Sequence, residues 1–156
     1  MKALTISQPY ATLIATGEKW VENRRWGTAY RGPLAIHAGK GTQYMDRRDL
    51  LALATEYPTG CIMAVAELVA CVNIERTRRW DRSTVLATGI TVDDVLSHEH
   101  AEGPWCWVLQ NIRRLSAIVY CPGSQGLWDV RAPASRELLR QLLHGKETSN
   151  DGTKQV

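Results

Sequence analysis

Three charged side chains that lie close together in the sequence could form a binding or catalytic site. They are Lys19, Glu22 and Arg24. In an extended chain Glu22 and Arg24 point the same way, about 7 Å apart at the backbone, a gap that long side chains can close. Lys19 could act as a base or nucleophile, or as a permanent cation that holds a phosphate. The alternative is an exposed strand with ordinary ion pairs.

Glu67 is the only charged residue between Cys61 and Val72. Regular alternation along a strand places it on one face with apolar residues, namely Met63, Val65, Val69 and Cys71. A buried carboxylate must be protonated, face a cation or line a pocket, because burial disfavours its charge. We therefore predict a buried Glu67. It either forms part of a functional site or makes a salt bridge that fixes the strand register.

Further polar, basic and aromatic residues could complete such a site. Gln8, Tyr10 and His37 could supply hydrogen bonds and a stacking face. Arginines cluster beside tryptophans, a combination that suits recognition of single strands, although a solvated basic surface around core tryptophans is the alternative. The clustered residues are Arg24, Arg25, Arg31, Arg76, Arg78, Arg79, Arg113 and Arg114, with Trp20, Trp26, Trp80 and Trp105 nearby. We expect Arg31, Lys40, Arg113 and Arg114 to follow a nucleic-acid backbone and Trp105 to contact the ligand.

The composition is that of one ordinary globular domain. The chain has 156 residues, of which 44% are hydrophobic and 22% charged, which excludes a fibrous or wholly disordered chain. No apolar run is long enough for a bilayer, and polar residues near the N-terminus argue against a signal peptide, so we expect a cytoplasmic protein. The four cysteines form no C-x-x-C pair, and His98-Glu99-His100 has no third ligand in view. We therefore expect reduced thiols and neither metal nor cofactor.

The hydrophobic periodicity predicts a mixture of strands and helices. Strands are expected at 2–7, 19–26, 33–38, 61–74, 105–115 and 127–130, and helices at 9–17, 46–57, 92–96 and 134–143. Residues 75–100 form a charged excursion, and 120–126 a Pro- and Gly-containing loop. Without a β-α-β rhythm, this order indicates an α+β fold with a small, mostly antiparallel barrel and flanking helices. One domain would span 1–144, and the polar tail 145–156 is expected to be disordered.

Several of these segments resemble the ASCH domain, a branch of the PUA-like superfamily. Ile6–Ala11 is similar to its N-terminal motif. Gly17-Glu18-Lys19, followed by Glu22 and Arg24, matches its G-x-K-x-x-E-x-R signature. Other matching segments follow in the family's order: Tyr30–Leu34, Ile36–Ala38, Gly60 with Glu67, Gly103 with Trp105 and Trp107, and Gly126–Trp128. The resemblance covers about residues 2–130.

The resemblance implies a small PUA-like β-barrel with a cleft that faces RNA or a nucleotide. ASCH domains have been linked to RNA or DNA binding, to coactivator roles and, in one bacterial branch, to hydrolysis of N4-acetylcytidine. The catalytic lysine and glutamate proposed for that branch correspond to Lys19 and Glu67. Its catalytic threonine is replaced by Glu22. A carboxylate there would pair with Lys19 or Arg24 and keep the lysine protonated.

Three functions are consistent with these observations. The first is binding of single-stranded RNA, single-stranded DNA or a modified nucleoside in a cleft near Lys19, Arg24 and Glu67, without involvement of a membrane. The second is amide hydrolysis of N4-acylated cytidine or a similar nucleoside, with Lys19, Glu22 and Glu67 as catalytic residues. The third is a protein-interaction adaptor. The sequence leaves the ligand and the oligomeric state open.

Overall fold

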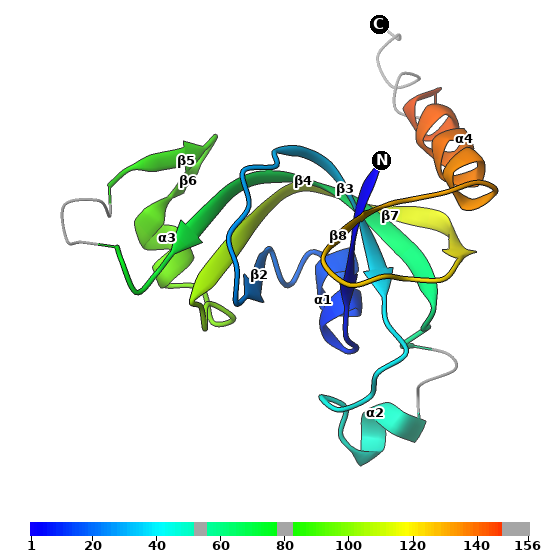
Figure 1. The fold of residues 1–156 in the computed structure, drawn as a ribbon, viewed down its shortest axis with the longest axis horizontal. Coiled ribbons are helices and arrows are strands. Elements are labelled where there is room, and N and C mark those ends of the chain that lie inside the picture. The colour runs from blue at the N-terminus through cyan, green and yellow to red at the C-terminus, as the bar shows by residue number, and fades with distance from the viewer. Residues whose placement is uncertain (52–55, 78–82, 148–156) are drawn as a thin grey trace, which may run out of the picture.

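The computed structural model describes residues 1–51, 56–77 and 83–147, and its centre is a six-stranded sheet. Its strand order is β2-β7-β4-β3-β1-β8. The strands are β1 (Lys2–Ile6), β2 (Val21–Arg24), β3 (Gly32–Ala38), β4 (Cys61–Asn73), β7 (Trp105–Tyr120) and β8 (Leu127–Asp129). β1 and β3 are parallel, and the other neighbours are antiparallel. The sheet curls into a half-barrel (Figure 1), which confirms the expected α+β class with a barrel-like, mostly antiparallel sheet.

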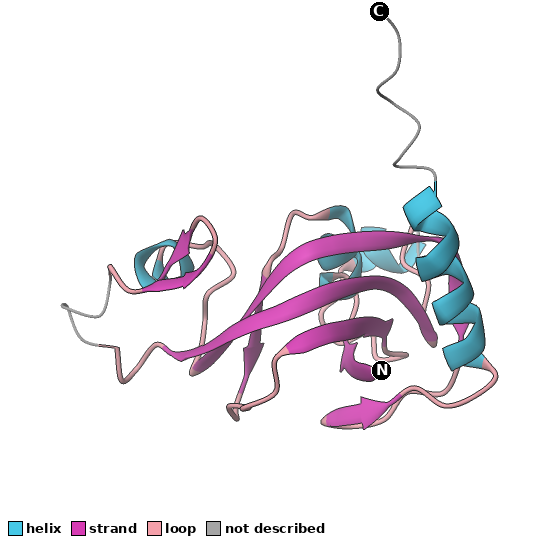
Figure 2. Cartoon of the chain, turned by 90° about the horizontal axis from the view of Figure 1, so that it is seen from above, coloured by secondary structure: helices cyan, strands magenta, loops and turns pink. Residues whose placement is uncertain are grey.

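The helices pack on different parts of this sheet. They are α1 (Tyr10–Thr16), α2 (Arg47–Leu51), α3 (Val92–Leu96) and α4 (Ala134–Glu147). Ile14 of α1 belongs to a core cluster with Leu4, Leu34 and Trp107, whereas Leu138 of α4 belongs to a second cluster, formed on the other side of the sheet. Figure 2 shows α4 across one end of the long strands and α3 beyond the other end. Helices predicted near 9–17, 92–96 and 134–143 are thereby confirmed.

The excursion at 75–100 carries a small element of its own. A two-stranded sheet, β5 (Val85–Ala87) and β6 (Ile90–Thr91), leads directly into α3. Thr91 begins this helix with a capping box, in which its hydroxyl oxygen accepts from the Asp94 amide while the Asp94 carboxylate accepts from the Thr91 amide. Val92 and Val95 then pack with Val21 of β2 in a third core cluster. The excursion is therefore docked beside the strand that carries Glu22 and Arg24.

The prediction that Glu67 is buried was wrong. Glu67 is exposed on β4, and its carboxylate accepts a hydrogen bond of 2.8 Å from Asn111. The β4–β7 pairing shifts register three times, once between Val65 and Glu67. Each irregularity interrupts the two-residue alternation that the prediction assumed, so that Met63 and Val65 pack in different core clusters. The carboxylate consequently needs no buried cation.

Other boundaries differ from the expected ones. The strand predicted at 105–115 continues to Tyr120, because β7 pairs with the curled β4 along its whole length. The helix predicted at 46–57 is described as α2 up to Leu51, while 52–55 lie outside the described residues. Most of the predicted tail, 148–156, lies outside them too. Within the part of the chain that is described, no helix combines the length and apolar character needed to cross a membrane.

Candidate functional site

The end of α1 determines where Lys19 lies. Gly17 adopts a left-handed conformation (φ 86°) and donates its N–H to the carbonyl of Ile14, which ends the helix. The Lys19 amide then donates to the carbonyl of Leu13 at 3.0 Å and directs the side chain back beneath the helix. Only 2% of Lys19 is exposed. A cation so deeply buried requires polar partners.

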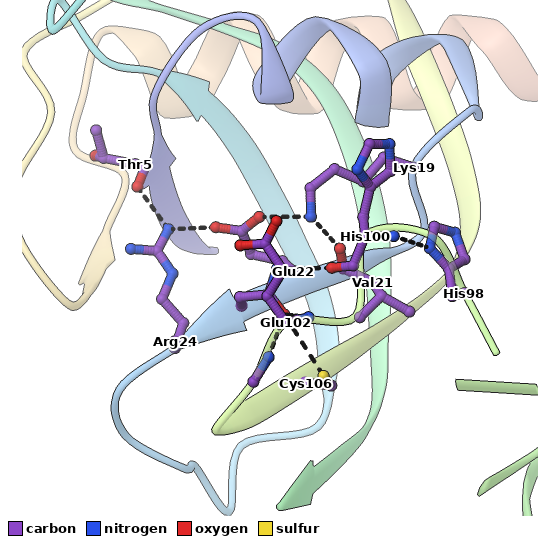
Figure 3. Close-up of polar contacts among 11 residues, drawn as sticks. Thr5, Lys19, Val21, Glu22, Arg24, His98, His100, Glu102 and Cys106 are labelled. Atoms are coloured by element: carbon purple, nitrogen blue, oxygen red, sulfur yellow. Dashed lines mark hydrogen bonds and ion pairs between the residues drawn. The ribbon is translucent and has the colours of Figure 1, made fainter. Parts of the chain in front are cut away.

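Glu22 supplies the charged partner of Lys19 and also contacts Arg24. The Lys19 ammonium lies 3.1 Å from one Glu22 carboxylate oxygen and donates to the carbonyl of Val21. The other carboxylate oxygen lies 3.1 Å from Nη2 of Arg24, which also donates to the carbonyl of Thr5 at 2.8 Å. Figure 3 shows Glu22 between the two cations. The predicted grouping of Lys19, Glu22 and Arg24 is therefore present as one network, in which Lys19 and Glu22 are buried and Arg24 is partly exposed.

This network lines a pocket of about 350 Å³, here called the small pocket. Three aromatic rings surround it: Tyr10 lies 5.5 Å from Tyr44 and 6.2 Å from His100, measured between ring centroids. The Lys19 ammonium is 5.7 Å from the centre of the Tyr10 ring, within cation–π range. Other residues of the lining are Thr5, Ile6, Ser7, Asn23, Gln43 and Glu102. The small pocket thus combines aromatic faces with hydrogen-bond donors and acceptors.

Asn23 holds the loop that closes one side of the small pocket. Its side-chain NH₂ donates to the carbonyl of His100 at 2.7 Å, and its side-chain oxygen accepts from the amides of Glu102 and Gly103, both at 3.0 Å. Asn23 lies on β2 between Glu22 and Arg24. One strand therefore carries both the charged network and the residue that positions His100 and Glu102.

A second and larger cavity adjoins the first. It measures about 1230 Å³ and is here called the large cleft. Thr5 and Arg24 line both cavities. The large cleft is further lined by Trp26, His37, Gly39, Lys40, Thr59, Gly60 and residues 120–126. Arg24 consequently lies where the two cavities meet.

His37 is buried beside the loop at 121–126. Its Nε2 lies 3.0 Å from the carbonyl of Cys121, its ring packs edge-on against Trp128, and its Nδ1 is buried without a hydrogen-bond partner among the described residues. A Cβ on Gly123 would come within 2.4 Å of the ring, so only glycine fits there. Burial lowers the pKa of His37, and the hydrogen bond to Cys121 opposes this shift only in part. The neutral ring therefore donates from Nε2 and offers Nδ1 as an acceptor.

Burial also shifts other titratable groups near the cavities. Burial, followed by the negative charge of Glu102, raises the pKa of Tyr10 above its usual value. Burial, followed by the neighbouring His100 and Lys19, lowers the pKa of His98, whose ring packs edge-on against Trp20. Tyr10 accordingly keeps its hydroxyl proton at neutral pH, as a hydrogen-bond donor to a ligand requires.

The predicted ligand residues divide between the two cavities. Tyr10, Lys19, Glu22 and Arg24 line the small pocket, and Arg24, His37 and Lys40 line the large cleft. These residues come from three elements and two loops that are separated in the sequence, and the curled sheet brings them together. The predicted site therefore consists of two adjoining cavities.

Four other predicted residues lie outside both linings. Gln8 is buried, and its amide is used internally, donating to Pro58 and accepting from the amide of Thr12. Arg31 donates to carbonyls of its own loop, and Trp105 packs against Gly27. Glu67 contacts Asn111 instead of Lys19. Gln8 therefore positions α1 near the small pocket without facing a ligand.

Two further basic residues that were predicted to contact the ligand are also away from the two cavities. Arg113 and Arg114 are exposed on β7 and line neither cavity. Arg78, Arg79 and Trp80 lie outside the described residues. The described cations that do line the cavities are Lys19, Arg24 and Lys40.

Several residues of the two cavities were not predicted from the sequence. They are Thr5, Asn23, Gln43, Tyr44, His100, Glu102 and the residues at 120–126. Tyr44, His100 and Glu102 lie in loops whose sequence has no pattern that predicts a site. Only their tertiary contacts show that they line the small pocket. The sequence carried one signal for Asn23, which lies between Glu22 and Arg24, both of them predicted to belong to the site.

A curled half-barrel with a polar pocket beside its first helix defines the class of small PUA-like domains, a fold associated with RNA binding. The family model described as the ASCH domain matches residues 4–118, and the chain belongs to this family. The resemblance found in the sequence is thereby confirmed.

Solved structures of similar fold come from Zymomonas mobilis. The crystal structure of a tyrosine-to-phenylalanine variant of its ASCH protein has a TM-score of 0.52 and 16% identity, covering 89% of this chain and 96% of that one. A serine-to-alanine variant has a TM-score of 0.51 and 15% identity, covering 89% and 94%. At this identity the similarity shows the fold alone.

Curated relatives share part of the chain. Activating signal cointegrator 1 from Mus musculus is 33% identical over a match of 82 residues that covers 45% of this chain and 14% of that protein. The protein of the same name from Homo sapiens is 30% identical over the same length, with the same coverage. The match thus spans about a seventh of each relative's length.

Proposed function

We propose that this protein binds single-stranded nucleic acid, RNA in particular, and that an unpaired base occupies the small pocket. The observation that carries the proposal is the placement of three aromatic rings around the Lys19–Glu22–Arg24 network. Aromatic side chains stack on bases of any sequence, while a base edge presents both donors and acceptors. Tyr10, Tyr44 and His100 supply the rings, and the charged network supplies polar groups of both kinds.

The size of the small pocket supports an unpaired base. About 350 Å³ falls at the lower end of the range for small-ligand sites, about 300–1,000 Å³. A base held in a duplex is paired and stacked and could not enter it. Proteins that read RNA sequence take bases that are splayed out from loops or single strands. The ligand would therefore be single-stranded RNA, single-stranded DNA or a free modified nucleoside.

Fluorescence anisotropy with labelled single-stranded RNA tests the proposal. We expect binding that weakens steeply with added salt and a weaker signal for the matching duplex. Tyr44→Ala should weaken binding by about fivefold or more, since stacking on one aromatic ring contributes about 1–3 kcal/mol. Leu139→Ala is a matched control, because Tyr44 and Leu139 are 58% and 55% exposed and Leu139 lies on α4. Binding that is absent at low salt, or equal in the two variants, would contradict the proposal.

Amide hydrolysis of an acylated nucleoside is the second candidate. Two of its predicted catalytic residues, Lys19 and Glu22, lie side by side in a pocket of nucleoside size, where the ion pair makes Lys19 a cation rather than a nucleophile. Glu22, rather than Glu67, is the carboxylate next to Lys19. The test is release of cytidine from N4-acetylcytidine, compared between wild type and Lys19→Met/Glu22→Gln, which removes both groups without leaving an unpaired buried charge. Product formation that is lost in this variant supports the hydrolase, and absence of product in the wild type removes it.

A protein-interaction role is the third candidate. The relatives named activating signal cointegrator 1 give it some support, since that name describes a coactivator. Their match covers only 14% of each relative, so the support is indirect. This role gains weight only if neither RNA nor N4-acetylcytidine elicits a response.

A further inference from the structure

The large cleft has the chemistry of a nucleotide site of its own. Arg24 and Lys40 provide two cations, and the described residues that line it include no carboxylate. Trp26 lines it as well and is 38% exposed, with its ring held edge-on against Trp107 at 4.7 Å between centroids. A tryptophan fixed by its neighbour can stack on a base without losing much rotamer freedom.

Two buried polar atoms beside the large cleft have no hydrogen-bond partner within the part of the chain that the structure describes. They are Nε of Arg24 and Nδ1 of His37, and both residues line this cleft. Leaving a buried donor or acceptor unpaired is unfavourable, by an amount comparable to a lost hydrogen bond. His37 is 2% exposed, so its unpaired nitrogen is a feature of the interior. Both atoms lie behind the wall of the large cleft, so they add polar character there without facing a ligand directly.

Arg24 lies between the two cavities with its orientation already determined. Nη2 is held by the Glu22 carboxylate and the Thr5 carbonyl. The guanidinium is a planar fork that matches the geometry of a phosphate. Since Arg24 lines both cavities, an anion bound to it would have the small pocket on one side and the large cleft on the other.

We propose that the large cleft is a second nucleotide subsite, so that the shortest ligand filling the site is a dinucleotide. Its 3′ base would occupy the small pocket, its linking phosphate would contact Arg24, and its 5′ base would stack on Trp26 with the 5′-phosphate near Lys40. This inference rests on the proposed function and narrows it to oligonucleotides rather than free nucleosides.

A comparison of short ligands tests the inference. The full chain is titrated with the four ribonucleoside 5′-monophosphates, with dinucleotides of the same bases that carry a 5′-phosphate, and with the 2′-deoxy forms, by calorimetry or by tryptophan fluorescence. We expect dinucleotides to bind at least about tenfold more tightly than mononucleotides, because a second stacked base and a second phosphate contact are added. Comparison with the 2′-deoxy forms then distinguishes RNA from DNA.

Variants of the large cleft locate the second nucleotide. Lys40→Glu and Trp26→Ala should each weaken dinucleotide binding by about fivefold or more and change mononucleotide binding by less than about twofold. Arg136→Glu is the matched control for Lys40→Glu, because it makes the same change in net charge at an exposed position on α4. Lys40 is exposed too, so Lys40→Glu keeps the test informative if Trp26→Ala disturbs packing.

The outcomes separate this inference from the proposed function. Mononucleotides and dinucleotides that bind equally well, or dinucleotide binding that neither variant changes, overturn the second subsite and leave the base in the small pocket. No binding of any single-stranded ligand overturns both. A dinucleotide advantage that disappears in Lys40→Glu but persists in Arg136→Glu supports the second subsite.

Discussion

The ammonium of Lys19 lies 3.1 Å from the carboxylate of Glu22, and both side chains are at least nine-tenths buried. A pair of this kind adds little net stability by itself, because removing two charges from water is costly. Its effect is to keep two charges largely inaccessible to solvent, with a defined orientation toward Tyr10 and Arg24. This property suits a site that must recognise polar groups.

Replacing only one member of this pair should destabilise the fold. Glu22→Gln leaves the Lys19 ammonium buried without an opposite charge, and we expect the free energy of unfolding to fall by about 3 kcal/mol. Urea unfolding measures it. The double variant Lys19→Met/Glu22→Gln should recover much of the loss, since it removes the unpaired charge. A single variant within about 0.5 kcal/mol of wild type would show that the pair is not buried in solution.

Arg24→Lys should reduce nucleic-acid affinity without changing its salt dependence. Lysine retains the charge, so the slope of log affinity against log salt stays the same. It lacks the planar fork that contacts Glu22 and Thr5 while facing a phosphate, so we expect affinity for single-stranded RNA to fall about tenfold. Anisotropy at several salt concentrations measures both quantities. Full affinity in this variant would argue against a phosphate at Arg24.

Asn23→Ala should release the loop beside the small pocket. The substitution removes the acceptor of the Glu102 and Gly103 amides and the donor to His100. We expect faster hydrogen exchange at those two amides and a loss of about 1–3 kcal/mol of stability.

Asn111→Gly provides the comparison for Asn23→Ala. Asn111 makes a single side-chain contact with the exposed Glu67, and glycine tolerates its positive φ of 49°. Exchange at Glu102 and Gly103 should be unchanged in this control. Unchanged exchange in Asn23→Ala as well would mean that other contacts hold the loop.

The buried His37 should make the protein less stable in mild acid. Its pKa in the folded state is lowered from the ordinary value of 6.5, so below that value the unfolded chain binds more protons. The free energy of unfolding therefore falls as the pH decreases from about 6.5 toward the pKa of His37 in the folded state. Above about pH 6.5 this group does not affect it. His98, whose pKa is also lowered, contributes in the same direction.

Urea unfolding between about pH 7.5 and 5 measures this dependence. His37→Gln should show a shallower loss of stability than wild type, because glutamine does not titrate. The range stops at about pH 5 to avoid the titration of carboxylates. Equal slopes in the two proteins would mean that His37 is accessible to protons in the folded state.

Much of the fold was predictable because local patterns agree with tertiary packing. α1 follows from the spacing of its apolar residues and from Gly17, and its predicted bounds differ from the observed ones by one residue at each end. β3 likewise keeps the alternation that places Leu34 and Ile36 in one cluster and Ala35 in another. In these segments each side chain packs as its local periodicity requires.

The prediction for Glu67 failed for the opposite reason. β4 is paired on both sides and curls through three register shifts toward β7, so that its side chains do not alternate regularly. Curling of a sheet depends on several strands together. No pattern within one strand specifies where its pairing shifts register by an extra residue. Glu67 is therefore no partner of Lys19, whereas the predicted pairing of Glu22 with Lys19 or Arg24 is present with both.

The sequence by itself determined the family, the α+β class and the pairing of Glu22 with Arg24, because residues two apart in an extended strand point the same way. Lys19 joins this pair because the end of α1 turns it toward Glu22. Only the tertiary structure decided what surrounds them. Tyr44, His100 and Lys40 reach the cavities through loops that the curled sheet brings close, and Arg24 lies between two cavities because β2 ends beside β1. Contacts between distant segments depend on the path of the whole chain, which local spacing does not contain.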